Sequence, residues 1–173
     1  PGAELSVNPD RRAGLVPGTA SVQVSASGAG RLNVPAILRA LDRYPYGCTE
    51  QITSRAMPLV YLNDVAIQAG LGGDPDVHDR VEKAIAGVLA NQSASGSFGL
   101  WAPGSEDMWL DAYVTDFLGR ARQKGFAVPG EAFDLALGSL KNRLAYSADF
   151  TSGGEDISYA LYVLASNGRA AIG

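Results

Sequence analysis

Hydrophobic residues from Leu32 onward recur at the three- and four-residue spacing of amphipathic helices. The first pattern covers residues 34–41, with Pro35 in the first turn, where a proline is tolerated. Further helices are predicted at residues 50–70, 74–91, 105–124, 129–146 and 155–167. Pro58 is expected to kink or interrupt the second of these helices, because its ring removes a backbone N–H from the helical ladder.

Turn residues mark the ends of several of these helices. Asp74 is a good N-cap with Pro75 as the first helical residue, and Asp107 completes the polar run that opens the next helix. Gly125 and Gly168 are suitable helix terminators. Helix and turn alternate with a period of roughly 25 residues, which is typical of stacked helical hairpins. The predicted fold class is therefore all-α.

Residues 1–31 differ from the rest of the chain. They contain three prolines and five glycines, and only residues 5–7 and 21–25 have an extended pattern. We interpret this part as a short β or linker segment left from a preceding β domain, and residues 32–173 as the helical domain.

The overall composition fits one globular domain. The chain has 173 residues, of which 46% are hydrophobic and 18% charged, enough for a core without disulfide or metal support. Its net charge of −4 and its scattered Lys and Arg residues argue against nucleic acid as a partner, because phosphate binding needs a basic face. No signal peptide or membrane-spanning segment is visible, and we interpret the Pro-Gly start as that of an excised segment.

The chain has one cysteine, Cys48, so it can form no internal disulfide. Cys48 comes directly before a predicted helix, whose free N–H groups and positive dipole end favour a thiolate. Gln51 follows three positions later, one helical turn away, so its carboxamide carbon can reach back to the sulfur. Displacement of ammonia by the thiolate would close an internal thioester in a ring of roughly fifteen atoms, which the first turn of a helix accommodates.

An internal thioester is a stored acylating agent. An attacking amine takes the acyl group of Gln51 and releases Cys48 as a thiolate, whereas water converts residue 51 to glutamate. Storage requires that apolar and aromatic side chains keep water away. The candidates for this cover are Tyr44, Tyr46, Met57 and one of the tryptophans Trp101 and Trp109.

The run from Pro45 to Gln51, PYGCTEQ, resembles the thioester motif P-x-G-C-x-E-Q of alpha-2-macroglobulins and complement components. The longer run at residues 44–59 looks like the bacterial branch of this family in particular. Residues 109–114, WLDAYV, are similar to the W-L-x-A-Y-V segment of thioester domains. The resemblance covers residues 32–173. It implies a thioester between Cys48 and Gln51, with a thioester loop and shield formed by Tyr44, Pro45, Tyr46, Gly47, Thr49, Glu50 and Met57.

The resemblance implies the thioester module of a bacterial alpha-2-macroglobulin-like endopeptidase inhibitor, which is not an enzyme. The family fold is an α/α toroid of helical hairpins, of which this chain would hold only a part. A protease that cuts a bait region elsewhere in the protein exposes the thioester and is tethered through its lysine amines. No cofactor and no metal are implied.

The family also implies a cellular setting. Its bacterial members are periplasmic proteins of the cell envelope, often anchored as lipoproteins and associated by gene context with a penicillin-binding protein. The expected partners are therefore attacking proteases, the other domains of the same full-length chain and, by family context, a penicillin-binding protein.

Two features depart from the pattern of vertebrate members. Thr49 stands where they usually have glycine. A β-branched residue is strained at a positive φ, whereas in helical or β geometry threonine is a good N-cap, and we favour the second. Complement components that prefer hydroxyl targets use a downstream histidine. The only histidine, His78, comes too early for that role, so direct attack by amines is expected.

Other interpretations are weaker. Asp74, Asp76, His78 and Asp79 are metal-ligating residue types, but their spacing fits no calcium loop and suits the solvated first turn of a helix. The loop at residues 92–101 resembles turns of α/α-toroid enzymes such as terpenoid cyclases and prenyltransferases, yet the acidic and zinc motifs of those enzymes are missing. A Cys48–His78 hydrolase has no identifiable orienting residue. The serious alternative is a structural or interaction domain in which the motif persists but no thioester forms.

Overall fold

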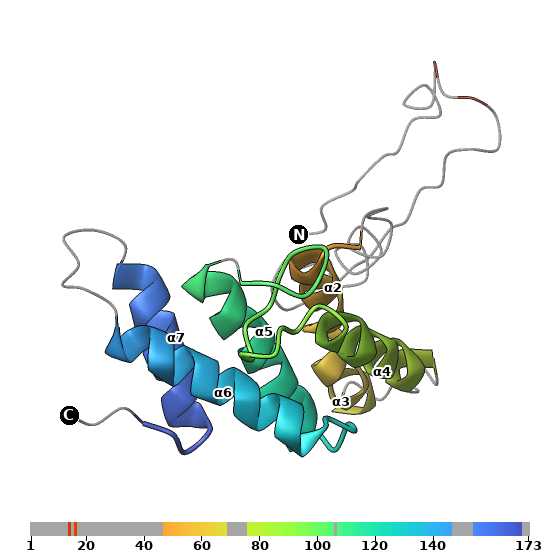
Figure 1. Cartoon of the computed structure of the whole chain (residues 1–173). Coiled ribbons are helices and arrows are strands. Elements are labelled where there is room, and N and C mark those ends of the chain that lie inside the picture. Colours follow the sequence, from red (N-terminus) through yellow and green to blue (C-terminus); the bar gives the residue numbers. More distant parts are fainter. Residues whose placement is uncertain are drawn as a thin grey trace, which may run out of the picture. The chain divides into compact units, whose positions relative to one another are not determined.

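The computed structural model describes residues 14, 16, 47–68, 76–105, 107–146 and 154–170. The described helices are α2 (Thr49–Ala56), α3 (Leu59–Gln68), α4 (Asp76–Leu89), α5 (Met108–Gln123), α6 (Gly130–Ala145) and α7 (Gly154–Ser166) (Figure 1). Extended pairing in this described part is limited to isolated bridges from Gln92 to Phe98 and Gly104. The prediction of an all-α array is confirmed. None of the described helices is long and apolar enough to cross a bilayer.

Several predicted features lie outside the described residues. These are the helix at 34–41, the extended segments at 5–7 and 21–25, the helix start at Asp74 and Pro75, and the loop residues Tyr44, Pro45 and Tyr46. The helices α2 to α7 all belong to one compact unit, Ala36–Gly173. The predicted domain boundary between residues 31 and 32 stays a prediction.

The helix ends follow local chemistry. Pro58 separates α2 from α3, and the last N–H of α2, at Met57, still donates to the Thr53 carbonyl at 2.8 Å. The Asp107 carboxylate accepts the Leu110 N–H at 2.7 Å and so caps α5, close to the helix start predicted at residue 105. Gly125 follows that helix with a φ of +87°, a conformation in which a side chain is strained. The sequence rules therefore place these ends correctly.

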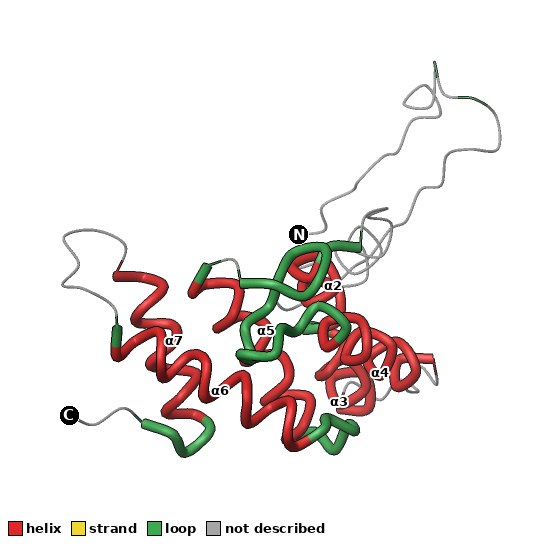
Figure 2. Tube along the Cα trace, in the orientation of Figure 1, coloured by secondary structure: helices red, strands yellow, loops and turns green. Residues whose placement is uncertain are grey.

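Helix α5 is the central element of the unit. It packs against α2 and α4 and also against α6 and α7, which lie on its other side in Figure 1. Phe117 and Leu118 in its middle are fully buried, and each buried side chain of this size stabilises the fold by about 1.5–3 kcal/mol. The α4–α5 connection passes over the start of α2 (Figure 2), so a loop rather than a helix covers the end where Cys48 lies.

A charged cluster ties α5 to α7. The buried Asp116 carboxylate accepts a hydrogen bond from Arg120 Nε at 2.8 Å and from the Tyr159 hydroxyl at 2.9 Å. Arg120 also donates to the Tyr162 hydroxyl at 3.1 Å. Burial raises the pKa of Tyr159 above its ordinary value of 10, and the Asp116 carboxylate raises it further.

Candidate functional site

Cys48 is the residue from which α2 begins. Its backbone is extended, with φ −68° and ψ 158°, and its carbonyl accepts the Ile52 N–H at 2.9 Å. Its side chain makes no capping hydrogen bond and no disulfide, and the residue is only 6% exposed. Gln51 follows in the first turn of the same helix. The structure therefore brings a buried thiol and a carboxamide to one helix end, as predicted from their spacing.

The carboxamide oxygen of Gln51 is buried and has no hydrogen-bond partner. No other side-chain nitrogen or oxygen of the described residues is both buried and unpartnered. An unpaired buried acceptor costs about 1–3 kcal/mol, so folded proteins rarely retain one without a reason. This oxygen belongs to the side-chain carboxamide of Gln51, which a thioester bond to Cys48 would convert to a thioester carbonyl.

Thr49, between the two, is fully buried and all its polar groups are paired. Its N–H donates to the Leu100 carbonyl at 2.8 Å, and its hydroxyl donates to the Gly99 carbonyl at 2.6 Å. The same hydroxyl accepts a hydrogen bond from Asn91 Nδ2 at 2.8 Å. Thr49 is helical and none of the described non-glycine residues has a positive φ. The expectation of helical or β geometry at Thr49 is confirmed, but its expected role as N-cap is wrong: the N-cap is Cys48, whose backbone is extended, and the threonine hydroxyl contacts the loop.

That loop, residues 91–104, is itself held from the other side by α5 and α6. The Phe98 N–H donates to the Asp111 carboxylate at 2.8 Å, and Arg143 donates to the other oxygen of Asp111 at 2.8 Å. Burial raises the pKa of Asp111, and the Phe98 N–H and Arg143 oppose this rise. A side chain at Gly99 would lie 2.1 Å from the Ala102 carbonyl oxygen, so the loop is tight enough to require glycine. The Gly99 and Leu100 carbonyls are therefore fixed acceptors.

A second set of contacts flanks the first turn of α2. Ser54 donates to the Glu50 carboxylate at 2.8 Å, and its hydroxyl lies 3.1 Å from the Tyr113 hydroxyl. Tyr113 stacks on Trp109 with 4.9 Å between ring centroids. Glu50 thus lies in the first turn, where its charge suits the helix dipole, and it is tied to α5.

The other predicted residues lie as follows. Gly47 is exposed, and Met57 packs on the core at the opposite end of α2 from Cys48. Trp101 is 67% exposed in the loop next to the Leu100 carbonyl that binds Thr49. The shielding roles of these residues stay predictions. The side chain of His78 is 69% exposed and stacks on Phe126, away from the described site residues.

Sequence reasoning missed Asn91, Gly99 and Asp111 as members of this site. The sequence predicts Asn91 only as the last residue of the 74–91 helix and Gly99 only as part of the 92–101 loop. The usable signal was the tight loop sequence Phe98-Gly99 just after a helix end, since a buried glycine loop needs partners for its carbonyls.

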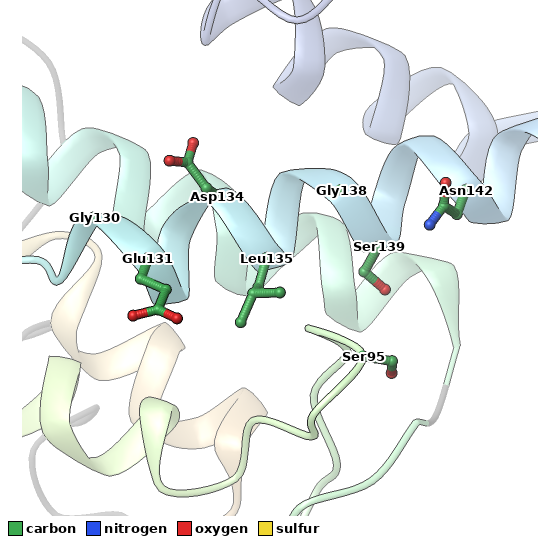
Figure 3. A pocket seen from close by; sticks show the side chains of 8 residues that line it. All are labelled: Ser95, Gly130, Glu131, Asp134, Leu135, Gly138, Ser139 and Asn142. Carbon is green, nitrogen blue, oxygen red and sulfur yellow. The ribbon is translucent and has the colours of Figure 1, made fainter.

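Two open grooves lie elsewhere on the described surface. One, of about 670 Å³, runs along α6, where Glu131, Leu135 and Ser139 point toward the loop that carries Ser95 while Asp134 points away (Figure 3). The other, of about 360 Å³, lies between α2 and α4. Neither of these two grooves is lined by Cys48 or Gln51.

Comparison with known proteins gives the family. The family described as the A-macroglobulin TED domain matches residues 21–143, which include Cys48, Gln51 and the loop that holds Thr49. The alpha-2-macroglobulin of Escherichia coli (strain K12) is 38% identical over 138 residues, which is 78% of this chain and 8% of that protein.

Solved structures show the same fold. The crystal structure of Salmonella alpha-2-macroglobulin reacted with methylamine is 35% identical and superposes with a TM-score of 0.69, covering 81% of this chain and 10% of that chain. The crystal structure of trypsin-activated alpha-2-macroglobulin from Escherichia coli is 36% identical with a TM-score of 0.63, covering 73% of this chain and 10% of that one. The chain thus spans about a tenth of the length of these relatives. It belongs to the A-macroglobulin TED domain family and resembles the bacterial alpha-2-macroglobulins within it.

Proposed function

We propose that Cys48 and Gln51 form an internal thioester, and that this chain is the thioester module of a bacterial alpha-2-macroglobulin-like endopeptidase inhibitor. The observation that carries the proposal is the unpartnered, buried carboxamide oxygen of Gln51 one turn from a buried thiol. A thioester carbonyl is a weaker hydrogen-bond acceptor than an amide carbonyl and has no N–H groups to satisfy. A buried carbonyl oxygen without a hydrogen-bond donor therefore suits the thioester better than the carboxamide.

The chemistry balances in two steps. The Cys48 thiol gives up its proton and the thiolate attacks the side-chain carbonyl carbon of Gln51. A C–S bond forms, the C–N bond breaks, and the nitrogen leaves as ammonia with the proton that the thiol gave up. Later an amine attacks the same carbon, a C–N bond forms, and the C–S bond breaks. The sulfur leaves with the electron pair and takes up the proton that the amine loses. The protein is consumed in this reaction, so it acts as a covalent trap rather than as a catalyst.

The amine would come from a lysine of the attacking protease. The Salmonella relative has been reacted with methylamine and the Escherichia coli relative has been activated by trypsin, so an amine and a protease each act on members of the family. We infer that the same two agents act on the complete protein to which this chain corresponds. We further propose that this protein acts in the bacterial cell envelope, beside its other domains and a penicillin-binding protein.

Mass spectrometry of the complete inhibitor before and after methylamine tests the thioester. We expect the native mass to be lower by one ammonia, methylamine to appear on Gln51, and one thiol to be released at Cys48. Gln92 is a matched internal control, since it is half-buried too but donates to the Ala132 carbonyl at 2.9 Å and has no cysteine three residues before it. The Cys48→Ala variant should show neither the mass deficit nor the incorporation.

The outcomes separate the alternatives. An unmodified mass with a free Cys48 thiol in the wild type would mean that the chain is a helical interaction domain without a thioester. Glutamate at position 51 in the wild type, with glutamine retained in Cys48→Ala, would mean that the bond forms and is lost to water. If the bond is present, incubation with trypsin should give a protease adduct that survives denaturation and is missing in Cys48→Ala.

A further inference from the structure

We propose that Thr49 and Asn91 are positioning residues for the thioester: together they fix the first turn of α2 to the 91–104 loop, so that the Cys48 sulfur and the Gln51 carboxamide meet. This inference rests on the proposed thioester and assigns a role to two residues that take no part in the chemistry themselves.

The first turn of α2 lacks the usual means of fixing a helix start. The Cys48 side chain makes no capping hydrogen bond, so the N-cap residue accepts none of the free N–H groups of the first turn through its side chain. First turns fray readily when their N–H groups are unpaired. The only N–H in this turn with a described backbone partner outside the helix is that of Thr49, which donates to the Leu100 carbonyl at 2.8 Å. The loop therefore takes the place of a cap.

The Thr49 hydroxyl makes this contact directional. Asn91 Nδ2 donates to the hydroxyl oxygen at 2.8 Å, so the hydroxyl proton is left to donate to the Gly99 carbonyl at 2.6 Å. Asn91 also holds the loop, because its carbonyl accepts the Gly99 N–H at 3.0 Å. Asn91 thus binds both the first turn of α2 and the part of the loop, at Gly99, that this turn contacts.

This anchor sets which way the reacting groups face. Successive helical residues are rotated by about 100°, so Gln51 lies on nearly the opposite side of the helix from Thr49. When the loop holds the helix face that carries Thr49, it also sets the direction in which the Gln51 side chain leaves the helix. It holds the peptide group between Cys48 and Thr49 in place as well. Ring closure depends steeply on such placement, because a misplacement of about 1 Å can lower the rate of an intramolecular reaction by about a hundredfold.

Thr53 provides a matched control on the same helix. It is also fully buried, but its hydroxyl donates only to the Thr49 carbonyl at 2.8 Å, a bond within α2 that touches no loop residue. Thr49→Val and Thr53→Val are therefore the same near-isosteric change at two equally buried sites of one helix. They differ in whether the lost hydroxyl reaches the loop.

The experiment measures, in the complete inhibitor, the fraction of molecules that lack one ammonia and the rate of methylamine incorporation, beside the melting temperature. Thr49→Val should lower the thioester fraction by about tenfold, and Thr49→Ser, which keeps the hydroxyl, should restore it to within about twofold of the wild type. Thr53→Val should stay within about twofold of the wild type as well. Asn91→Ala, a milder change that keeps the threonine bond to Gly99, should lower the fraction by about threefold.

Equal thioester fractions in Thr49→Val and Thr53→Val would overturn the proposal. So would losses in all variants that simply follow the melting temperature, since a merely structural role predicts that relation. If Thr49→Val does not fold, Asn91→Ala decides: a wild-type fraction in that variant refutes the role of the pair. A wild-type protein with no ammonia deficit would instead refute the proposed thioester itself.

Discussion

Two buried carboxylates on α5 lie five residues apart and have different tasks. Asp111 binds the backbone N–H of Phe98 and the guanidinium of Arg143, so it fixes a loop between two helices. Asp116 binds only side chains, those of Arg120 and Tyr159, and joins α5 to α7. The first carboxylate binds the loop that holds Thr49, whereas none of the described hydrogen bonds of the second carboxylate reaches that loop.

The different partners of Asp111 and Asp116 make it possible to separate the stability of the helical unit from the formation of the thioester. Both carboxylates stabilise the fold, because each is buried and paired with a cation and a second donor. Only the loss of Asp111 removes a support from the carbonyls that bind Thr49. Variants at the two positions can therefore show whether the thioester depends on this loop in particular or on the stability of the helical unit in general.

The largest effect is expected for Asp111→Ala. Alanine is a good helix former, so α5 persists, but the Phe98 N–H and Arg143 lose their buried partner, at a cost of about 3 kcal/mol in the free energy of unfolding. The loop is then free to shift, and the thioester fraction should fall by about tenfold. Chemical denaturation measures the first quantity and the mass deficit of one ammonia measures the second. A stable variant with a full thioester fraction would show that the loop does not need Asp111.

Asp116→Ala is the matched change in the charged cluster. We expect a loss of about 2 kcal/mol in the free energy of unfolding, smaller than at Asp111 because Arg120 keeps the Tyr162 hydroxyl and is partly open to water. The thioester fraction should remain at the wild-type level, since Asp116 makes no described hydrogen bond to the 91–104 loop that holds Thr49. The same two measurements apply, and a thioester loss as large as that of Asp111→Ala would contradict the separation of the two regions.

The sequence predicted those features of the fold that depend only on residues close together in the chain. The break at Pro58 and the helix stop at Gly125 each depend on one residue and its immediate neighbours, and each lies where it was expected. The pairing of Cys48 with Gln51 was likewise available, because one helical turn fixes their separation whatever the rest of the fold does.

The partners of Thr49 could not be predicted in the same way. Asn91, Gly99 and Leu100 lie 42 to 51 residues further along the chain, and they meet Thr49 only because the α4–α5 loop crosses the start of α2. The spacing of hydrophobic residues in the sequence does not indicate which loop crosses which helix. The sequence therefore predicted the backbone geometry of Thr49 but not its partners. The helix that carries Asp111 was predicted from its hydrophobic spacing, which does not show that this carboxylate binds the loop.

The smallest effect is expected for Tyr159→Phe, which sharpens the account of the charged cluster through its pH dependence. Loss of the hydroxyl bond to Asp116 should lower the free energy of unfolding by about 1 kcal/mol near neutral pH. The folded state raises the pKa of Tyr159 above 10, through burial first and Asp116 second, so the unfolded chain ionises at lower pH than the folded protein. The stabilising contribution of Tyr159 is therefore complete below pH 10 and is lost as the pH rises above it. Denaturation of both proteins between neutral and strongly alkaline pH should show a constant difference that shrinks above pH 10. A difference that stays constant throughout would mean that Tyr159 titrates alike in both states, and that the cluster joins α5 to α7 without holding its phenol in the neutral form.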